Sequence, residues 1–177
     1  MYYYRMKLTD EEKIELEKVY QSFLNDEKIL KMQEIPMHRG SNCYLHSFKV
    51  AKRAIRYAEK SRKKDINFHV VLLGSILHDY YLYDWRSDRS KRKKHGHNHP
   101  QIASENAFRD FNISKEVRKI IESHMWPINI TNYPDSKEAK IVSICDKAVT
   151  IKEASTSKAY KEKRKAYYLS YISKLFK

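Results

Sequence analysis

The segment Phe68-His69-Val70-Val71-Leu72-Leu73-Gly74-Ser75-Ile76-Leu77-His78-Asp79 places a histidine and an aspartate directly after ten almost entirely apolar residues. On apolar pattern alone, residues 68–77 fit either a buried strand or a buried helix. We predict a helix, because ten residues suit a helix and the chain offers no partner strands. The pair His78-Asp79 is then expected at the end of a buried helix.

Local signals on both sides of this segment predict further helices. Thr9-Asp10-Glu11-Glu12 is a capping box, so a helix is expected from there to about Lys31. Pro100 is tolerated in a first helical turn, and Ser114 is a suitable N-cap for a helix that ends before Pro127. Apolar residues at three- and four-residue spacing predict the other helices, over 43–60, 136–155 and from about 158.

The composition agrees with an all-α protein. The chain has 177 residues, enough for one domain, and only 3 glycines and 4 prolines to supply turns. We expect a compact single-domain helical bundle of about six to eight helices. Within it, residues 1–33 would form an N-terminal helix that packs on a core domain of residues 34–155, and residues 156–177 a basic C-terminal helix.

The cysteines and the N-terminus bear on the compartment. Cys43 and Cys145 are too few and too far apart for a disulfide framework or a zinc ribbon. The start Met1-Tyr2-Tyr3-Tyr4-Arg5 lacks the apolar region of a signal peptide, and no apolar run is long enough to span a membrane. We expect a cytoplasmic protein with no membrane partner.

The charge is strongly positive and uneven. Lysine and arginine total 36 against 22 acidic residues, a formal charge of +14, with basic blocks at 49–64, 86–94 and 152–177. Such blocks suit nucleic acid or small phosphorylated molecules, and equally suit a chain that uses lysine for solubility.

Six histidines and aspartates lie at expected helix ends or on apolar helices that face a core. A buried carboxylate such as Asp146 is costly unless a positive charge meets it. A single buried histidine is more often a hydrogen-bonded core residue, but six such coincidences are less plausible than one shared metal site. The six candidate ligands are His46, His78, Asp79, His99, His124 and Asp146.

The order His46, His78-Asp79, Asp146 resembles the H…HD…D signature of the HD superfamily of metal-dependent phosphohydrolases. The surrounding helices are similar as well, over roughly residues 38–155. His99 and His124 occupy the positions of the added histidines in binuclear members, and the chain resembles a stand-alone bacterial HD protein with this binuclear-type pattern. The Gly-Tyr-Pro element of the cyclic-dinucleotide branch is absent.

The resemblance implies a divalent metal centre with two ions, in which the aspartate of the HD pair bridges them. Mixed nitrogen and oxygen ligands favour iron or manganese, with zinc or nickel as alternatives. Two ions would activate water for attack on a phosphoester or phosphoanhydride. The catalytic residues are then Asp79, His78 and Lys147, and the substrate-binding residues His38, Arg39, Arg86 and Trp126.

The expected substrate is a nucleotide or another small phosphorylated metabolite. One alternative is a regulatory module that binds a nucleotide, or nucleic acid through its basic faces, without turnover. A less favoured one is a di-iron oxygenase on the same helical scaffold. The terminal segments either cap the core or form the face of a homodimer.

Overall fold

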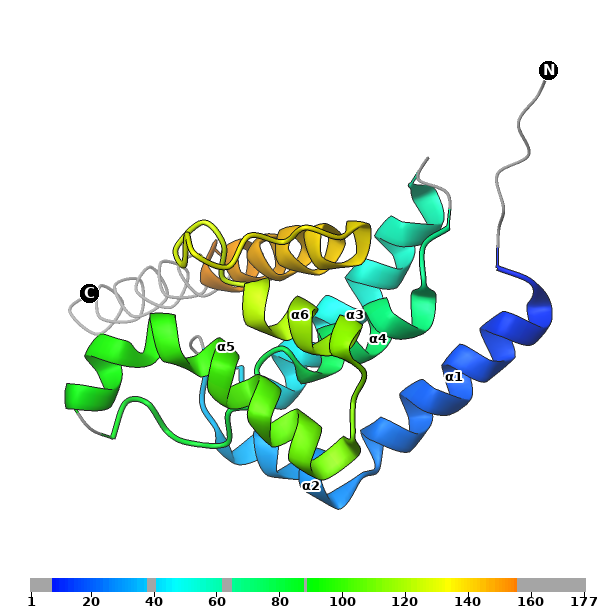
Figure 1. Ribbon diagram of the computed structural model, residues 1–177. Helices are drawn as coiled ribbons and strands as arrows, with labels where there is room; N and C mark the ends of the chain where they lie inside the picture. The colour runs from blue at the N-terminus through cyan, green and yellow to red at the C-terminus, as the bar shows by residue number, and fades with distance from the viewer. Residues whose placement is uncertain (1–7, 38–40, 62–64, 88, 156–177) are drawn as a thin grey trace, which may run out of the picture.

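The computed structural model describes residues 8–37, 41–61, 65–87 and 89–155, and within these ranges it is helical with no β-strand. The all-α prediction is therefore confirmed. Its elements are α1 (Asp10–Leu24), α2 (Glu27–Leu30), the short 3₁₀ helix η1 (Lys31–Glu34), α3 (Cys43–Lys60), α4 (Phe68–Leu77), α5 (Arg89–Phe111) and α6 (Lys115–Ser123). A final helical stretch covers residues 137–155 (Figure 1).

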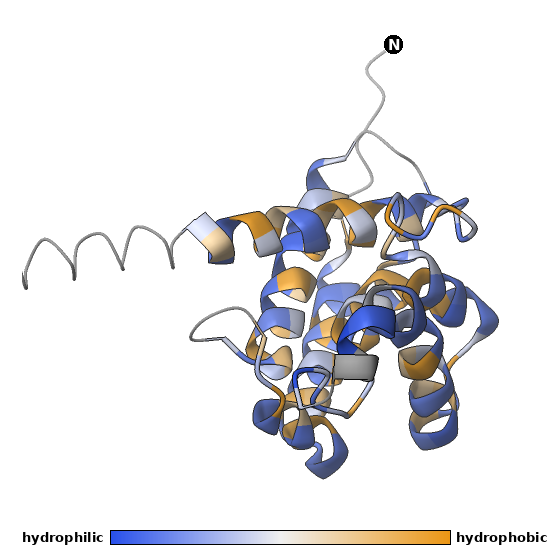
Figure 2. Ribbon diagram, turned by 90° about the vertical axis from the view of Figure 1, so that its left-hand side faces the viewer, coloured by the Kyte–Doolittle hydropathy of each residue, from blue (hydrophilic) through white to orange (hydrophobic). Residues whose placement is uncertain are grey.

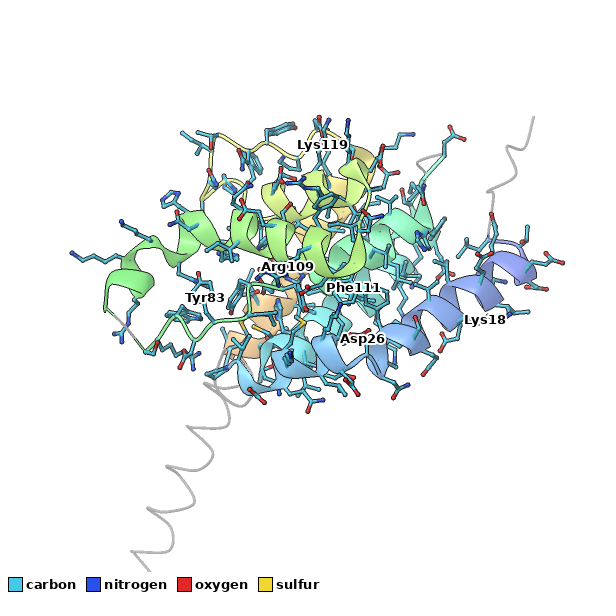
Figure 3. All side chains as sticks on the ribbon, turned by 60° about the horizontal axis from the view of Figure 1, so that its bottom comes forward. Lys18, Asp26, Tyr83, Arg109, Phe111 and Lys119 are labelled. Carbon is cyan, nitrogen blue, oxygen red and sulfur yellow. The ribbon has the colours of Figure 1, made fainter. Side chains whose placement is uncertain are left out.

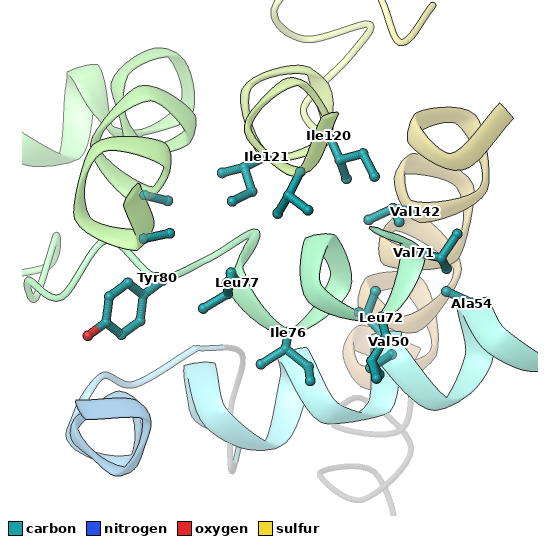
Figure 4. Close-up of a cluster of buried hydrophobic side chains, with 14 of the residues drawn as sticks. Val50, Ala54, Val71, Leu72, Ile76, Leu77, Tyr80, Ile120, Ile121 and Val142 are labelled. Carbon is teal, nitrogen blue, oxygen red and sulfur yellow. The ribbon is translucent and has the colours of Figure 1, made fainter. Parts of the chain in front are cut away.

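The core is built around α4, whose sequence is apolar on all sides. Leu72, Ile76 and Leu77 are at most 2% exposed, and α4 packs on α3 and on α6. Figure 4 shows side chains of α3, α6 and the 137–155 helix, including Val50, Ile120 and Val142, converging on this helix. A helix that is hydrophobic all round is stable only when neighbours enclose it, which explains why α4 is central.

Several helices begin and end where the sequence predicts. The bounds of α3 and α4 match the predicted ranges, so the helix interpretation of residues 68–77 is confirmed. Thr9 and Glu12 form both hydrogen bonds of the capping box. Ser114 caps α6 by accepting from the N–H of Val117.

The predicted helix from Thr9 to about Lys31 is wrong in its length. The first helix ends at Leu24, and α2 and η1 follow as separate short elements. Asp26 accepts hydrogen bonds from the N–H groups of Lys28 and Ile29, so it starts a new helix. An aspartate that caps the next helix competes with continuation of the previous one.

The prediction that Pro100 lies in the first turn of a helix is also wrong. α5 starts at Arg89, well before Pro100, which lies inside the helix. Proline lacks the N–H that would bond to the carbonyl of Gly96, which weakens a helix interior without always ending it.

Helix α1 packs along one side of the bundle with its partly buried apolar residues. Tyr20 meets Phe48 of α3 edge to face at 5.2 Å, and Phe23 lies 5.2 Å from Phe111 of α5.

The predicted basic helix over residues 156–177 lies outside the described residues.

Charged side chains cover the outside of the bundle. Lys18 on α1, Arg109 on α5 and Lys119 on α6 lie at its surface (Figure 3). Figure 2 shows hydrophobic positions recurring along neighbouring helices, alternating with hydrophilic ones. Among the described helices, none is both long and apolar enough to cross a membrane.

Gly74 allows α4 and α6 to approach closely. A Cβ atom at this position would lie 2.7 Å from Cγ2 of Ile120, a β-branched residue that is itself buried. At Gly96 in α5, by contrast, an added Cβ would meet nothing within 4 Å.

We expect Gly74→Ala to lower the free energy of unfolding by ~1–3 kcal/mol, because the added methyl group overpacks the contact between α4 and α6. Gly96→Ala is the matched control and should be neutral or stabilising by up to ~1 kcal/mol, since alanine favours a helix. Urea denaturation of both variants measures this. Equal effects at the two positions would show that the close approach at Gly74 does not matter.

Candidate metal centre

The six predicted ligands come from five segments and meet in the interior. All of them are buried, with at most 7% of each residue exposed. Two mark helix ends, since His78 is the C-cap of α4 and His124 the C-cap of α6. The others lie in α3, directly after His78, in α5 and in the 137–155 helix, and are His46, Asp79, His99 and Asp146.

The two carboxylate oxygens of Asp79 face different pairs of histidines. Oδ2 lies 3.3 Å from Nε2 of His78 and 3.9 Å from Nε2 of His46. Oδ1 lies 3.4 Å from Nε2 of His99 and 3.7 Å from Nε2 of His124. Asp79 therefore stands between two sets of donor atoms.

Asp146 completes the first of these sets. Its Oδ1 lies 3.1 Å from Nε2 of His46 and 3.7 Å from Nε2 of His78. The hydroxyl of Thr150, one turn further along the same helix, donates to this oxygen at 3.3 Å.

Each of the four histidines uses its Nδ1 for a hydrogen bond to an oxygen acceptor. In three of them the acceptor is a backbone carbonyl of the same helical segment, at 2.7 Å, and the pairs are His78 with Ser75, His99 with His95 and His124 with Ile121. Nδ1 of His46 instead lies 3.0 Å from Oε2 of Glu153. Because neither a carbonyl nor an ionised carboxylate can donate, Nδ1 carries the proton, and Nε2 of the neutral ring presents a lone pair.

These lone pairs point at one another and at the carboxylates. The Nε2 atoms of His99 and His124 are 3.0 Å apart, and Nε2 of His78 is buried without a hydrogen-bond partner among the described residues. An arrangement of facing lone pairs and negative oxygens is stable only with positive charge between them. The residues therefore fit divalent metal ions. They form three overlapping groups of three ligands, and within each group the ligand atoms lie within 4.8 Å of one another.

Without metal, protons supply part of this positive charge. Burial opposes protonation of His46, but the hydrogen bonds to Asp146 and Glu153 outweigh it and raise its pKa to about 9. Burial likewise opposes charge on His78, Asp79 and Asp146. The attraction between the histidines and the carboxylates outweighs burial, which raises the pKa of His78 and lowers the pKa of both carboxyls. Burial and the neighbouring histidines lower the pKa of His124 to about 3, so that ring is neutral.

Lys147, predicted to be catalytic, lies next to the centre, and its side chain contacts the backbone of His124. Its Nζ donates to the carbonyl of His124 at 2.8 Å, and to the carbonyl and hydroxyl oxygens of Ser143. These three acceptors match the three N–H groups of an ammonium ion. Lys147 thus ties the end of α6 to the 137–155 helix, and its catalytic role stays a prediction.

Arg86, predicted to bind substrate, is joined to the centre by stacked rings. Its guanidinium lies over Trp85 at 5.0 Å, Trp85 stacks on His95 at 5.0 Å, and His95 stacks on the ligand candidate His99 at 4.5 Å. Burial and the neighbouring His99 lower the pKa of His95 to about 4, so this ring is neutral at pH 7.

The remaining predicted substrate residues are less closely tied to the centre. Trp126 lies two residues after His124, is 37% exposed, and meets Tyr133 edge to face at 5.3 Å. His38 and Arg39 lie outside the described residues.

Sequence reasoning missed Glu153. This residue follows Asp146 by seven positions on the same helix, so both side chains lie on one face two turns apart. That spacing was the available signal, but it does not reveal which partner the second carboxylate meets.

A family model described as HD domain matches residues 43–150, which include all six candidate ligands. Neither the curated proteins nor the solved structures contain a significant match to this sequence.

The stability of the metal-free protein should depend on pH through His46. Its ordinary pKa of 6.5 rises to about 9 on folding, so protonation stabilises the fold fully below pH 6.5, and this contribution is lost as the pH rises toward 9. We expect the free energy of unfolding to fall over this range by up to about 1.4 kcal/mol per pH unit for each such proton. Urea denaturation in the presence of a chelator measures it.

His46→Gln, which cannot be protonated, should show a shallower decline over the same range. An equally steep decline in wild type and His46→Gln would mean that His46 does not carry the effect.

Proposed function

This chain belongs to the HD-domain family, a superfamily of metal-dependent phosphohydrolases, and we propose that it hydrolyses a phosphoester or phosphoanhydride of a nucleotide or another small phosphorylated metabolite. The observation that carries the proposal is the position of Asp79 between two pairs of histidine nitrogens. A carboxylate with donors on both sides could hold two metal ions close together, as a hydrolase that uses two ions requires.

The donor atoms support two ions in one centre. His46 and His78 lie near Oδ2 of Asp79 and also near Oδ1 of Asp146, while His99 and His124 face Oδ1 of Asp79. Imidazole and carboxylate ligands without thiolate suit iron or manganese, with zinc or nickel as alternatives. When bound, these ions would supply Lewis acidity toward water and toward a phosphoryl oxygen.

The protein's own part is to hold the ligands rigidly. The Nδ1 hydrogen bonds fix the plane and tautomer of each ring, so that its Nε2 faces the centre. Lys147 and Ser143 both donate to the carbonyl of His124, which stabilises the chain at that ligand. Such fixed geometry means that the ligands need little rearrangement during reaction.

The position of Arg86 favours the proposal of a phosphorylated substrate. Its guanidinium is exposed and lies at the outer end of the stack formed with Trp85, His95 and His99. A guanidinium pairs well with phosphate oxygens through two parallel hydrogen bonds. We propose that Arg86 binds the phosphate groups of the substrate that extend away from the metal centre.

Binding of nucleic acid through the basic segments and formation of a homodimer stay predictions. For the first, Lys52, Arg53 and Arg56 form an exposed basic face on α3. Affinity for nucleic acid that falls steeply with salt concentration would support this role.

We expect protein purified without an affinity tag, then loaded with manganese or iron, to release inorganic phosphate from nucleoside mono- or polyphosphates. His78→Ala should reduce this release to background, because it removes a ligand that faces both carboxylates. His97→Ala is the control, since His97 is an exposed histidine on α5. Absence of turnover by the metal-loaded wild type over the whole substrate panel would contradict the proposal.

We also expect elemental analysis of the wild type to give two metal ions per chain. His99→Ala should retain one, because it removes a ligand on the Oδ1 side of Asp79 and leaves His46, His78 and Asp146 in place. His97→Ala should retain two. If His99→Ala held as much metal as the wild type, a second ion bound through His99 would be excluded.

A further inference from the structure

Glu153 joins the 137–155 helix to the start of α3. Its side chain is only 10% exposed and lies three residues beyond the segment that matches the family model. Oε2 accepts from Nδ1 of His46 at 3.0 Å, while Oε1 accepts from Nζ of Lys49 at 2.7 Å and from Oγ of Ser41 at 3.1 Å. Each oxygen thus has its own set of partners.

The histidines at helix ends find their Nδ1 acceptor within their own helix. The last carbonyls of an α-helix have no intrahelical partner, and Ser75 and Ile121 are such residues, three positions before the C-caps His78 and His124. The imidazole Nδ1–H groups of these two residues donate to those carbonyls. A helix C-terminus therefore orients its own histidine.

His46 is in the opposite situation, because it lies in the first turn of α3. The unpartnered groups at a helix N-terminus are N–H donors, and the carbonyl of Asn42 already accepts from the backbone N–H of His46. Unlike the other three rings, His46 has no backbone carbonyl as the acceptor for its Nδ1 among the described residues. The acceptor comes instead from a residue 107 positions later in the chain.

We propose that Glu153 is a positioning residue for the metal centre, which holds His46 in the tautomer that presents Nε2 to a metal ion. The inference rests on the metal centre proposed above. A carboxylate that accepts from the far nitrogen of a metal-binding histidine also raises the basicity of the ligating nitrogen. Oε1 has separate partners, Lys49 and Ser41, so the contact of Oε2 with His46 can be tested independently of them.

Binding of Co²⁺ to the full-length protein, followed by the visible absorption of the bound ion and by competition with a chelating dye, tests this role. We expect Glu153→Ala to weaken Co²⁺ affinity by about 10–100-fold and to change the absorption spectrum. Glu153→Gln should weaken it less, because the amide oxygen still accepts from Nδ1 but carries no charge.

Lys49→Ala is the matched control, because it removes the ion pair between α3 and the 137–155 helix without touching His46. Its Co²⁺ affinity and spectrum should stay close to those of the wild type. Equal weakening in Lys49→Ala and Glu153→Ala would overturn the inference, since helix anchoring would then explain both. Wild-type affinity in Glu153→Ala would also overturn it.

Two further outcomes separate this inference from the proposed function. If the wild type binds no Co²⁺, the metal centre itself is refuted, and with it the role of Glu153. If Glu153→Ala does not fold, Glu153→Leu decides, because leucine is of similar size and offers no acceptor to Nδ1, and an unchanged affinity in that variant overturns the inference.

Discussion

The structure depends on one electrostatic constraint, namely two buried carboxylates surrounded by four histidine rings. Asp79 and Asp146 lie in the core next to the apolar residues of α4, where an uncompensated charge would be costly. Each ring donates through Nδ1 to an outer acceptor, so the Nε2 atoms face the carboxylates. Protons on His46 and His78 supply positive charge in the metal-free protein, and metal ions would supply it more completely.

The fold meets this constraint by bringing helix ends together. The C-termini of α4 and α6 supply His78 and His124, and the carbonyls left over at those ends fix the two rings. The first turn of α3 supplies His46, and there Glu153 of the 137–155 helix, in place of a backbone carbonyl, accepts from Nδ1. Gly74 lets α4 and α6, which carry these two C-caps, approach each other closely.

The sequence predicts elements well where one local signal acts without competition. The bounds of α3 and α4, the capping box at Thr9 and the cap at Ser114 depend on neighbours three or four residues away. The two wrong predictions, the length of the first helix and the start of α5, arise where one local signal is compatible with two structures. Asp26 both interrupts a helical pattern and starts a new helix, and Pro100, which suits a first turn, is tolerated inside α5.

The sequence by itself determined the all-α class and the six residues of the candidate centre. Helical periodicity depends on neighbouring residues, and the order of His46, His78-Asp79 and Asp146 can be read directly from the sequence. The tertiary structure decided which oxygen of Asp79 faces which histidines, and that Glu153 rather than a backbone carbonyl orients His46. Such pairings join residues up to 107 positions apart, and they depend on the packing of whole helices, which no local pattern specifies.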